Sequence, residues 1–165
     1  MKIDVAYGKD LDDSMLEQLL YMEADAYACY ESIDSGEDKI VICAIPTESL
    51  KQFKKRTANV IFLMKTKTIK SNVKLVGMAC LSRSKKDMLH LHTVYVKSNW
   101  RRKGIGNALI KRALHEAKKM KCAINLSVNP LNYDAMKLYE SLGFKIGKGQ
   151  KLEMHALEKK NGKSR

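Results

Sequence analysis

The sequence predicts an α/β protein: one domain in which about four helices flank a mixed, mostly antiparallel sheet of six or seven strands. Its 165 residues, 45% of them hydrophobic, suit a single hydrophobic core. Segments with the alternation or continuous apolarity of strands are interspersed with segments of helical periodicity. A strand, a helix and a second strand succeed one another between residues 88 and 128. This succession requires a crossover and therefore a parallel pair within the sheet.

The first half of the chain predicts two helices. One covers residues 14–29, with Ser14 and Glu17 as a capping box at its start. Thr47 is expected to cap a second, short helix that ends at Lys55. Residues 30–46 give no clear assignment. The segments with strand patterns here are 2–6, 59–65 and 73–82, the last two joined by a mostly polar turn over 66–72.

The second half alternates more regularly. Residues 88–97 predict a strand, followed by a polar turn with two glycines and an amphipathic helix. The apolar stripe of that helix comprises Leu109, Ile110, Ala113, Leu114, Ala117 and Met120, with Glu116 among the residues expected on its outer face. Residues 122–128 form an apolar strand. Asn132 is expected to cap a short helix that Gly143 ends, and two last strands fall at 144–146 and 152–157.

Composition limits the compartment and the kind of site. No apolar run approaches the roughly 20 residues that a membrane-spanning helix needs, and the first residues lack a signal-peptide core. We therefore expect a cytoplasmic protein without membrane partners, with one domain over 1–158 and a frayed basic tail at 159–165. No CxxC pair occurs, so we expect no metal and reduced thiols. The cysteines are Cys29, Cys43, Cys80 and Cys122.

Charge is divided unequally along the chain. Residues 1–40 hold 11 acidic and 3 basic side chains, a net charge of −8, whereas residues 41–165 hold 7 acidic and 28 basic ones, a net charge of +21. A basic body favours a partner that carries phosphate, either a nucleotide cofactor or nucleic acid. No nucleic-acid recognition motif accompanies the charge, so nucleic acid is disfavoured as a partner but stays open.

The segment Arg101-Arg102-Lys103-Gly104-Ile105-Gly106 joins a strand to a helix. Glycines permit close backbone approach and positive φ, and the first N–H groups of a helix lack internal partners. Together with the helix dipole they form an anion site that would accept a pyrophosphate. The segment contains neither GxxxxGK[ST] nor GxGxxG, so it is not a known nucleotide-binding loop of either kind.

Two motifs in this order resemble the GNAT superfamily of N-acetyltransferases. The first is a strand followed by RxxGxG and an amphipathic helix. The second is N-x-x-A-x-x-L-Y-x-x-x-G-F, which begins at Asn132 and ends at Phe144. The resemblance covers residues 72–157. It implies acetyl-CoA as acetyl donor and a V-shaped opening between the parallel strands 88–97 and 122–128, in which the pantetheine arm pairs with a strand edge.

The resemblance also implies roles for individual residues. Tyr139 would be the general acid toward the coenzyme A sulfur, and Asn132 would reach the pantetheine or adenosine part of the cofactor. The strand residues expected to hold the thioester and pantetheine are Val94, Tyr95 and Val96. The loop and helix residues expected around the pyrophosphate are Arg101, Arg102, Lys103, Gly104, Ile105, Gly106 and Asn107.

His90 and His92 are the candidate bases. They are two residues apart on one strand, so their side chains share a face, just before the expected cofactor contact. Histidine accepts protons near neutral pH. Counted back from RxxGxG, the two match the His-x-His pair of serotonin N-acetyltransferases within the superfamily. The alternative is a pair of structural histidines, and the sequence does not choose between the two as base.

The acceptor is encoded weakly. The acidic first segment contains Tyr27 and Tyr30 and would wall the acceptor side, which favours a cationic or aromatic primary amine. The acidic residues concerned are Glu17, Glu23, Asp25, Glu31, Asp34, Glu37 and Asp38. An aminoacyl-tRNA- or protein-directed acetyltransferase, a non-catalytic coenzyme A-binding module and a homodimer all stay open.

Overall fold

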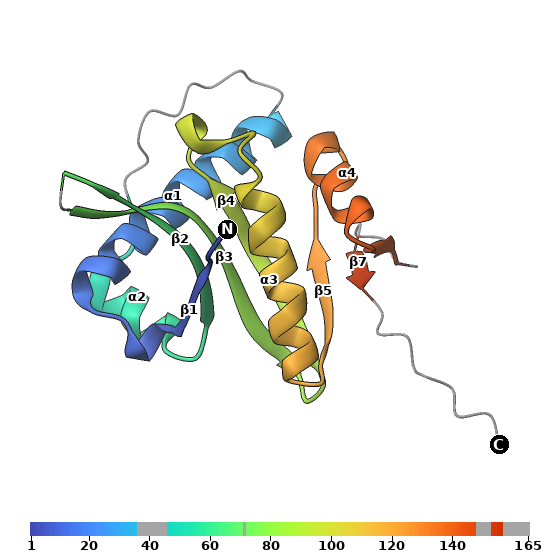
Figure 1. Ribbon diagram of the computed structural model, residues 1–165, viewed down its shortest axis with the longest axis horizontal. Coiled ribbons are helices and arrows are strands. Elements are labelled where there is room, and N and C mark those ends of the chain that lie inside the picture. Colours follow the sequence, from blue (N-terminus) through green and yellow to red (C-terminus); the bar gives the residue numbers. More distant parts are fainter. Residues whose placement is uncertain (36–45, 71, 148–152, 157–165) are drawn as a thin grey trace.

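One mixed sheet organises the molecule (Figure 1). The computed structural model describes residues 1–35, 46–70, 72–147 and 153–156, so the expected tail at 159–165 lies outside the described residues. Over these residues the sheet has seven strands in the order β1-β2-β3-β4-β5-β7-β6, and among these strands only β4 and β5 run parallel. This confirms the predicted fold class and the crossover. The strands are β1 (Asp4–Tyr7), β2 (Ile61–Ile69), β3 (Asn72–Lys85), β4 (Met88–Val96), β5 (Ala123–Ser127), β6 (Lys145–Ile146) and β7 (Glu153–Ala156).

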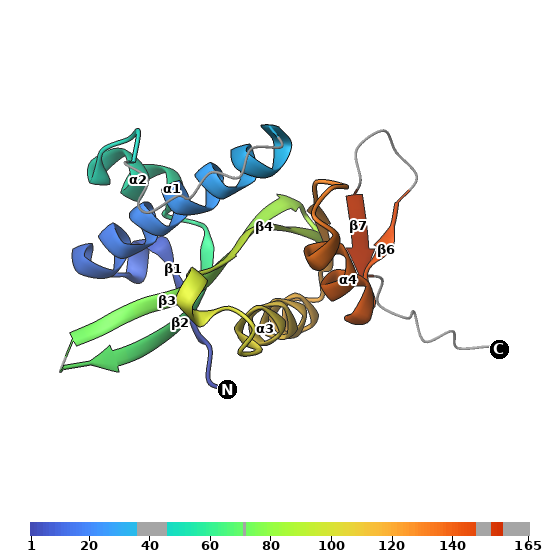
Figure 2. The ribbon, with the colours of Figure 1, turned by 90° about the horizontal axis from the view of Figure 1, so that it is seen from above.

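Helices cover both faces of the sheet. They are α1 (Asp13–Ser35), α2 (Leu50–Thr57), α3 (Ile105–Lys119) and α4 (Tyr133–Ser141). Figure 2 shows α1 and α2 on one face and α3 on the other. Two cores result. Leu109 and Ile110 of α3 pack with Leu89 and Leu91 of β4 in one core, whereas Leu19 of α1 packs with α2 and β3 in the other core.

The caps of α1 and α2 differ from the predicted ones. Asp12, not Ser14, begins α1: its Oδ1 accepts a hydrogen bond from the backbone N–H of Met15 at 2.8 Å. Ser49, not Thr47, begins α2 with a complete capping box to Gln52. In each case a cap must lie one residue outside the helix, and the helix starts where its apolar side chains can reach the sheet.

The β2–β3 hairpin is longer than predicted. Both strands continue through the stretch assigned to a turn, so that Ile69 pairs with Asn72. Lysines alternate with threonines there, and an exposed two-stranded ribbon has no apolar face that a sequence pattern could indicate.

The prediction that Glu116 lies on the outer face of its helix is wrong. Its side chain is buried, with the residue 7% exposed, and its Oε1 lies 2.8 Å from Nη2 of Arg112 on the same helix.

An irregularity in β4 separates two halves of the strand. Opposite β3, Cys80 pairs with His92 but Met78 pairs with Tyr95, so β4 holds one extra residue there. Thr93, with φ of 22°, lies in this β-bulge. A bulge reverses the alternation of side chains. Leu89 and Leu91 face α3 before it, and Val94 and Val96 face α3 after it, while Tyr95 faces the α1 side.

Replacing Ser49 by alanine should lower the free energy of unfolding by about 1 kcal/mol, because the backbone N–H of Gln52 loses its side-chain acceptor. Urea denaturation followed by circular dichroism measures this. Thr47→Ala is the matched control, since Thr47 is exposed and lies outside the helix. Equal losses in the two variants would contradict the assignment of the cap.

Candidate active site

The parallel strands β4 and β5 diverge in the middle of the sheet. They pair from Met88 with Ala123 to Leu91 with Leu126, and no described residue of β5 is in register with β4 beyond Leu91. From His92 to Val96, β3 is the only strand among the described residues with which β4 pairs. The edge of β4 that faces away from β3 is therefore not paired with a described strand there, and it could pair with a bound molecule, although the Val96 carbonyl already accepts a hydrogen bond from Nε of Arg101. Val94, Tyr95 and Val96, the expected cofactor strand, form this edge.

The N-terminus of α3 lies at the end of the turn that follows β4. Gly104 is its N-cap, with φ of 76° and no capping side chain. The backbone N–H groups of Ile105, Gly106 and Asn107 thus receive no side-chain cap from it, and they carry the positive end of the helix dipole. A Cβ built on Gly104 meets no atom within 4 Å, so the space beside it is open. Arg102 also has positive φ, at 58°.

The basic side chains of the turn have different surroundings. The side chain of Arg102 is 89% exposed, and its contact with the Asp134 carboxylate is long, at 3.8 Å. The side chain is therefore weakly held and can reorient toward an anion. Arg101 donates through Nε to the carbonyl of Val96 at 2.9 Å and lies over the ring of Tyr95. Lys103 donates to the carbonyl of Asn99 at 3.1 Å. Arg101 therefore ties the turn to β4, and its expected contact with phosphate stays a prediction.

Tyr139 lies in α4 and Asn132 immediately precedes this helix, which packs on the same face of the sheet as α3. Asn132 caps the helix as predicted, accepting from the N–H of Ala135 at 3.2 Å. Tyr139 is 9% exposed, and its ring centroid lies 5.7 Å from that of Phe144. Burial raises the pKa of Tyr139 to about 12. Its hydroxyl is therefore protonated at neutral pH, and burial makes it a weaker acid than an exposed tyrosine.

His90 and His92 share the face of β4 opposite Leu89 and Leu91, as predicted. Their ring centroids are 4.7 Å apart and the rings are nearly perpendicular. Nε2 of His92 contacts Oγ of Ser82 on β3, and Nδ1 of His90 lies 2.8 Å from Oδ1 of Asn125 on β5. Partial burial, then the charges of His90 and Arg56, lower the pKa of His92 to about 4. His92 is therefore neutral at physiological pH.

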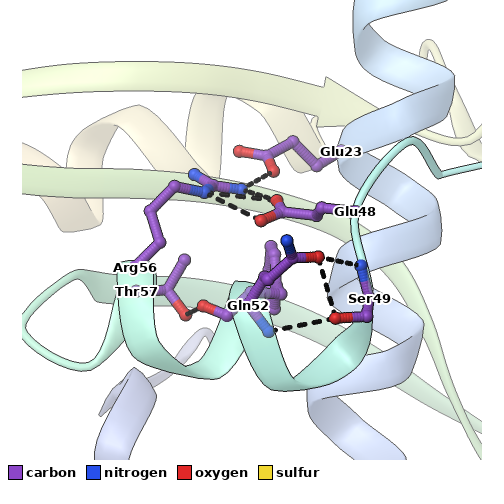
Figure 3. A network of polar contacts seen from close by, with 7 residues as sticks. Glu23, Glu48, Ser49, Gln52, Arg56 and Thr57 are labelled. Atoms are coloured by element: carbon purple, nitrogen blue, oxygen red, sulfur yellow. Dashed lines mark hydrogen bonds and ion pairs between the residues drawn. The ribbon is translucent and has the colours of Figure 1, made fainter.

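A cluster of charged residues joins α1, α2 and the segment before α2 (Figure 3), and its Arg56 acts on His92. Arg56 of α2 donates through Nη2 to Glu23 of α1 at 2.6 Å and also pairs with Glu48. These two carboxylates raise the pKa of Arg56, Glu48 first, and the three side chains together carry one net negative charge. The acidic cluster is defined here as Glu23, Glu48 and Arg56. Glu23 also acts on Tyr27, whose pKa is raised first by partial burial and then by this carboxylate.

The sequence reasoning missed Arg56, Ser82 and Asn125. Asn125 is the one with a signal, because it is a polar side chain in the middle of an apolar strand. Nothing near Arg56 in the sequence marks its partners, which lie 8 and 33 residues away. The side chains of Tyr30, Glu31 and Asp34, and all of Glu37 and Asp38, lie outside what the structure describes.

The donor set fits a phosphate-bearing thioester such as acetyl-CoA. The uncapped N–H groups of α3 and the exposed side chain of Arg102 suit phosphate. The edge of β4 beyond Leu91 suits an amide-containing arm.

Cys80 and Cys122 are buried free thiols. Burial raises the pKa of Cys80, which leaves it a poor nucleophile. Over the described ranges, no three metal-ligating side chains come together, and no helix among them has the length and apolarity to cross a membrane.

Comparison with known proteins agrees with this geometry. Residues 21–144 match the model of the acetyltransferase (GNAT) family. The PaiA N-acetyltransferase of Thermoplasma acidophilum, solved in complex with coenzyme A, is 19% identical over 96% of this chain and 100% of that chain, with a TM-score of 0.62. A GNAT-family acetyltransferase of Staphylococcus aureus is 18% identical over 90% and 89%, with a TM-score of 0.62.

An acyl-CoA N-acyltransferase of Pseudomonas aeruginosa is 14% identical over 95% of this chain and 100% of that chain, with a TM-score of 0.66. At these identities the structural likeness establishes the fold, and the family match comes from the sequence. No protein in the curated set matches the chain.

Stability should depend on pH through His92. Its pKa in the folded protein is about 4, below the value of about 6.5 expected when unfolded. The unfolded chain therefore binds a proton more readily, and stability should fall as the pH is lowered from 6.5 toward 4. His92→Gln should flatten this part of the curve of melting temperature against pH. The difference between the two proteins at about pH 7.5, where His92 is neutral in both states, serves as reference. Parallel curves would contradict the lowered pKa of His92.

Proposed function

The chain belongs to the GNAT acetyltransferase family, and we propose that it transfers an acetyl group from acetyl-CoA to a primary amine. The transfer is a direct attack within a ternary complex. The observation that carries the proposal is the edge of β4 beyond Leu91, which no described strand of the β5 side pairs with, next to the uncapped N-terminus of α3. One end of this site suits the pantetheine arm and the other suits the pyrophosphate.

In this proposal each part of the site holds one part of the cofactor. The backbone of Val94–Val96 pairs with the pantetheine arm, as one strand pairs with another. The N–H groups of Ile105–Asn107 and the side chain of Arg102 hold the pyrophosphate. Gly104 leaves room for close approach, since no atom lies within 4 Å of its Cβ position.

The chain's own residues manage protons. Acetyl-CoA supplies an activated carbonyl carbon: the amine nitrogen bonds to it, the carbon–sulfur bond breaks, and the electron pair leaves on sulfur. The histidine pair takes the first proton from the ammonium form of the acceptor, directly or through water. Tyr139 donates its hydroxyl proton toward the sulfur. The second proton lost by the acceptor nitrogen restores that hydroxyl through solvent.

The acceptor in this proposal is an amine with extra positive charge or an aromatic ring. The acidic cluster and Tyr27 lie on the side of the histidines away from α3. The net negative charge of the acidic cluster would attract a cation. The partly exposed ring of Tyr27 offers a face to an ammonium or aryl group. A cationic acceptor thus meets a negative wall, while the phosphates meet a positive turn.

A screen of amines and peptides with acetyl-CoA, reading the released thiol, tests the proposal as a whole. We expect turnover with cationic or aromatic amines and little with acidic peptides. Best turnover with acidic N-terminal peptides would contradict the acceptor class, and absence of turnover with every amine would leave only a binding module.

Gly104→Glu should raise the dissociation constant of acetyl-CoA by roughly tenfold or more, a loss of about 1.4 kcal/mol. The new carboxylate would project into the space intended for phosphate, and a non-glycine residue is strained at φ of 76°. Isothermal titration calorimetry measures the constant. Gly104→Asn controls for the strain, because asparagine tolerates this conformation. Unchanged affinity in a folded Gly104→Glu protein would rule out the phosphate site.

Tyr139→Phe should lower kcat by about 10²- to 10⁴-fold while acetyl-CoA affinity stays unchanged, because only the acid is removed. Stopped-flow measurement of acetyl transfer under single turnover gives the rate of the chemical step. Tyr133→Phe, on the same helix but 66% exposed, is the matched control and should leave the rate unchanged. Equal rates for Tyr139→Phe and wild type would make Tyr139 a packing residue.

Glu23→Gln should raise KM for a diamine about fivefold, since one unscreened charge contact is worth about 1 kcal/mol, and should leave KM for a neutral aromatic amine unchanged. Glutamine keeps a hydrogen-bond acceptor for Arg56. The control is Glu17→Gln, which removes the same charge from an exposed position of α1 beside the β2–β3 hairpin. Similar effects of the two substitutions on KM would show a general rather than a local field.

A further inference from the structure

A row of polar residues crosses the sheet between apolar positions. Ser82 of β3, His90 of β4 and Asn125 of β5 are direct partners in the strand register, and His155 of β7 stands opposite Asn125. The neighbours of His90 and Asn125 along their strands, Leu89, Leu91, Ile124 and Leu126, are all buried. Polar side chains among buried neighbours are in most cases hydrogen-bonded.

The bond between His90 and Asn125 has a direction. Nδ1 of His90 lies 2.8 Å from Oδ1 of Asn125, and an amide oxygen only accepts hydrogen bonds. The hydrogen between the two atoms therefore belongs to Nδ1. In a neutral imidazole one nitrogen carries the proton and the other has a lone pair, so the lone pair of His90 is on Nε2.

The two histidines differ in what occupies Nε2. In His92 this nitrogen contacts Oγ of Ser82. In the part of the chain that the structure describes, Asn125 is the only hydrogen-bond partner of the His90 ring. Nε2 of His90 thus has no competing partner among these residues, whereas Nε2 of His92 does. The two rings are therefore not equivalent as bases.

We propose that His90 is the base of the reaction and that Asn125 is a positioning residue, which holds His90 in the tautomer with the proton on Nδ1. The proposal rests on the proposed function and deepens it. Nε2 takes one proton from the acceptor ammonium, and the resulting imidazolium keeps its Nδ1–H bond to Asn125. His92 stays neutral beside it, with its ring nearly perpendicular to that of His90.

The surroundings of the pair set how the site responds to pH. Arg56 of α2 acts on His92, and Cys80 is the partner of His92 in the β3–β4 register. Glu23 and Tyr27 of α1 act on Cys80 and Arg56 rather than on the pair itself, and His155 of β7 is the register partner of Asn125. The positive charge of Arg56 is compensated by the two carboxylates of the acidic cluster. Partial burial first, then the charges of His90 and Arg56, lower the pKa of His92, so His92 is the neutral member of the pair in this proposal.

Nitrogen-15 NMR of histidine-labelled full-length protein tests the tautomer directly, without any ligand. We expect neutral His90 to carry its proton on Nδ1, and Asn125→Leu to shift it toward the Nε2 tautomer. Asn125→Asp keeps an acceptor and should retain the wild-type tautomer. Asn59→Leu, in the exposed turn before β2, is the matched control and should change neither the spectrum nor the activity.

Kinetics with acetyl-CoA and an amine then test the role. His90→Gln should lower kcat/KM by about 10²- to 10⁴-fold, and Asn125→Leu by about tenfold, part of that same contribution. Adding Asn125→Leu to the His90→Gln variant should not lower kcat/KM any further. Asn125→Asp should keep activity and move the acid limb of the pH profile to higher pH, because its carboxylate stabilises the imidazolium.

Several results would overturn the proposal: a proton on Nε2 of His90 in the wild type, a tautomer and a rate both unchanged in Asn125→Leu, or full activity in His90→Gln. Should Asn125→Leu not fold, Asn125→Asp still decides, since an unmoved acid limb contradicts the proposal. If no amine is acetylated at all, the proposed function fails, whereas the tautomer spectra still decide what Asn125 does to His90.

Discussion

The divergence of β4 from β5 after Leu91 is the constraint on which the rest of the site depends. Strands that stayed paired would use the backbone groups of Val94–Val96 within the sheet, and no edge would be left for a bound arm. The bulge at Thr93 occurs just beyond the last paired residue. It also reverses the side-chain alternation, which places the histidines and Tyr95 on the face of α1 and α2 while Val94 and Val96 pack under α3.

Charge is arranged around this opening in two opposed regions. The turn before α3 offers uncapped N–H groups and the exposed Arg102, while the other face of the sheet holds the acidic cluster of Glu23, Glu48 and Arg56. In the proposed reaction, a polyanion and a cation approach from different sides, and each meets the opposite charge.

The sequence predicted well where local pattern and motif agree. The β4–α3–β5 crossover, the cap at Asn132 and the shared face of His90 and His92 follow from periodicity and spacing over short distances. It failed where tertiary contacts choose among similar neighbours: Asp12 rather than Ser14, and Ser49 rather than Thr47. The acidic cluster joins two helices and the segment between them, and the His90–Asn125 bond joins strands 35 residues apart, so no local pattern could reveal either one.

Hydrogen–deuterium exchange of the amides with and without acetyl-CoA tests the central claim most directly, because it reports where the cofactor touches the backbone. The account predicts slower exchange at Val94–Val96 and at Ile105–Asn107 when acetyl-CoA is added, and unchanged exchange in the β2–β3 hairpin. Unchanged exchange at Val94–Val96, with protection elsewhere, would contradict the claim that the opening between β4 and β5 is the cofactor site.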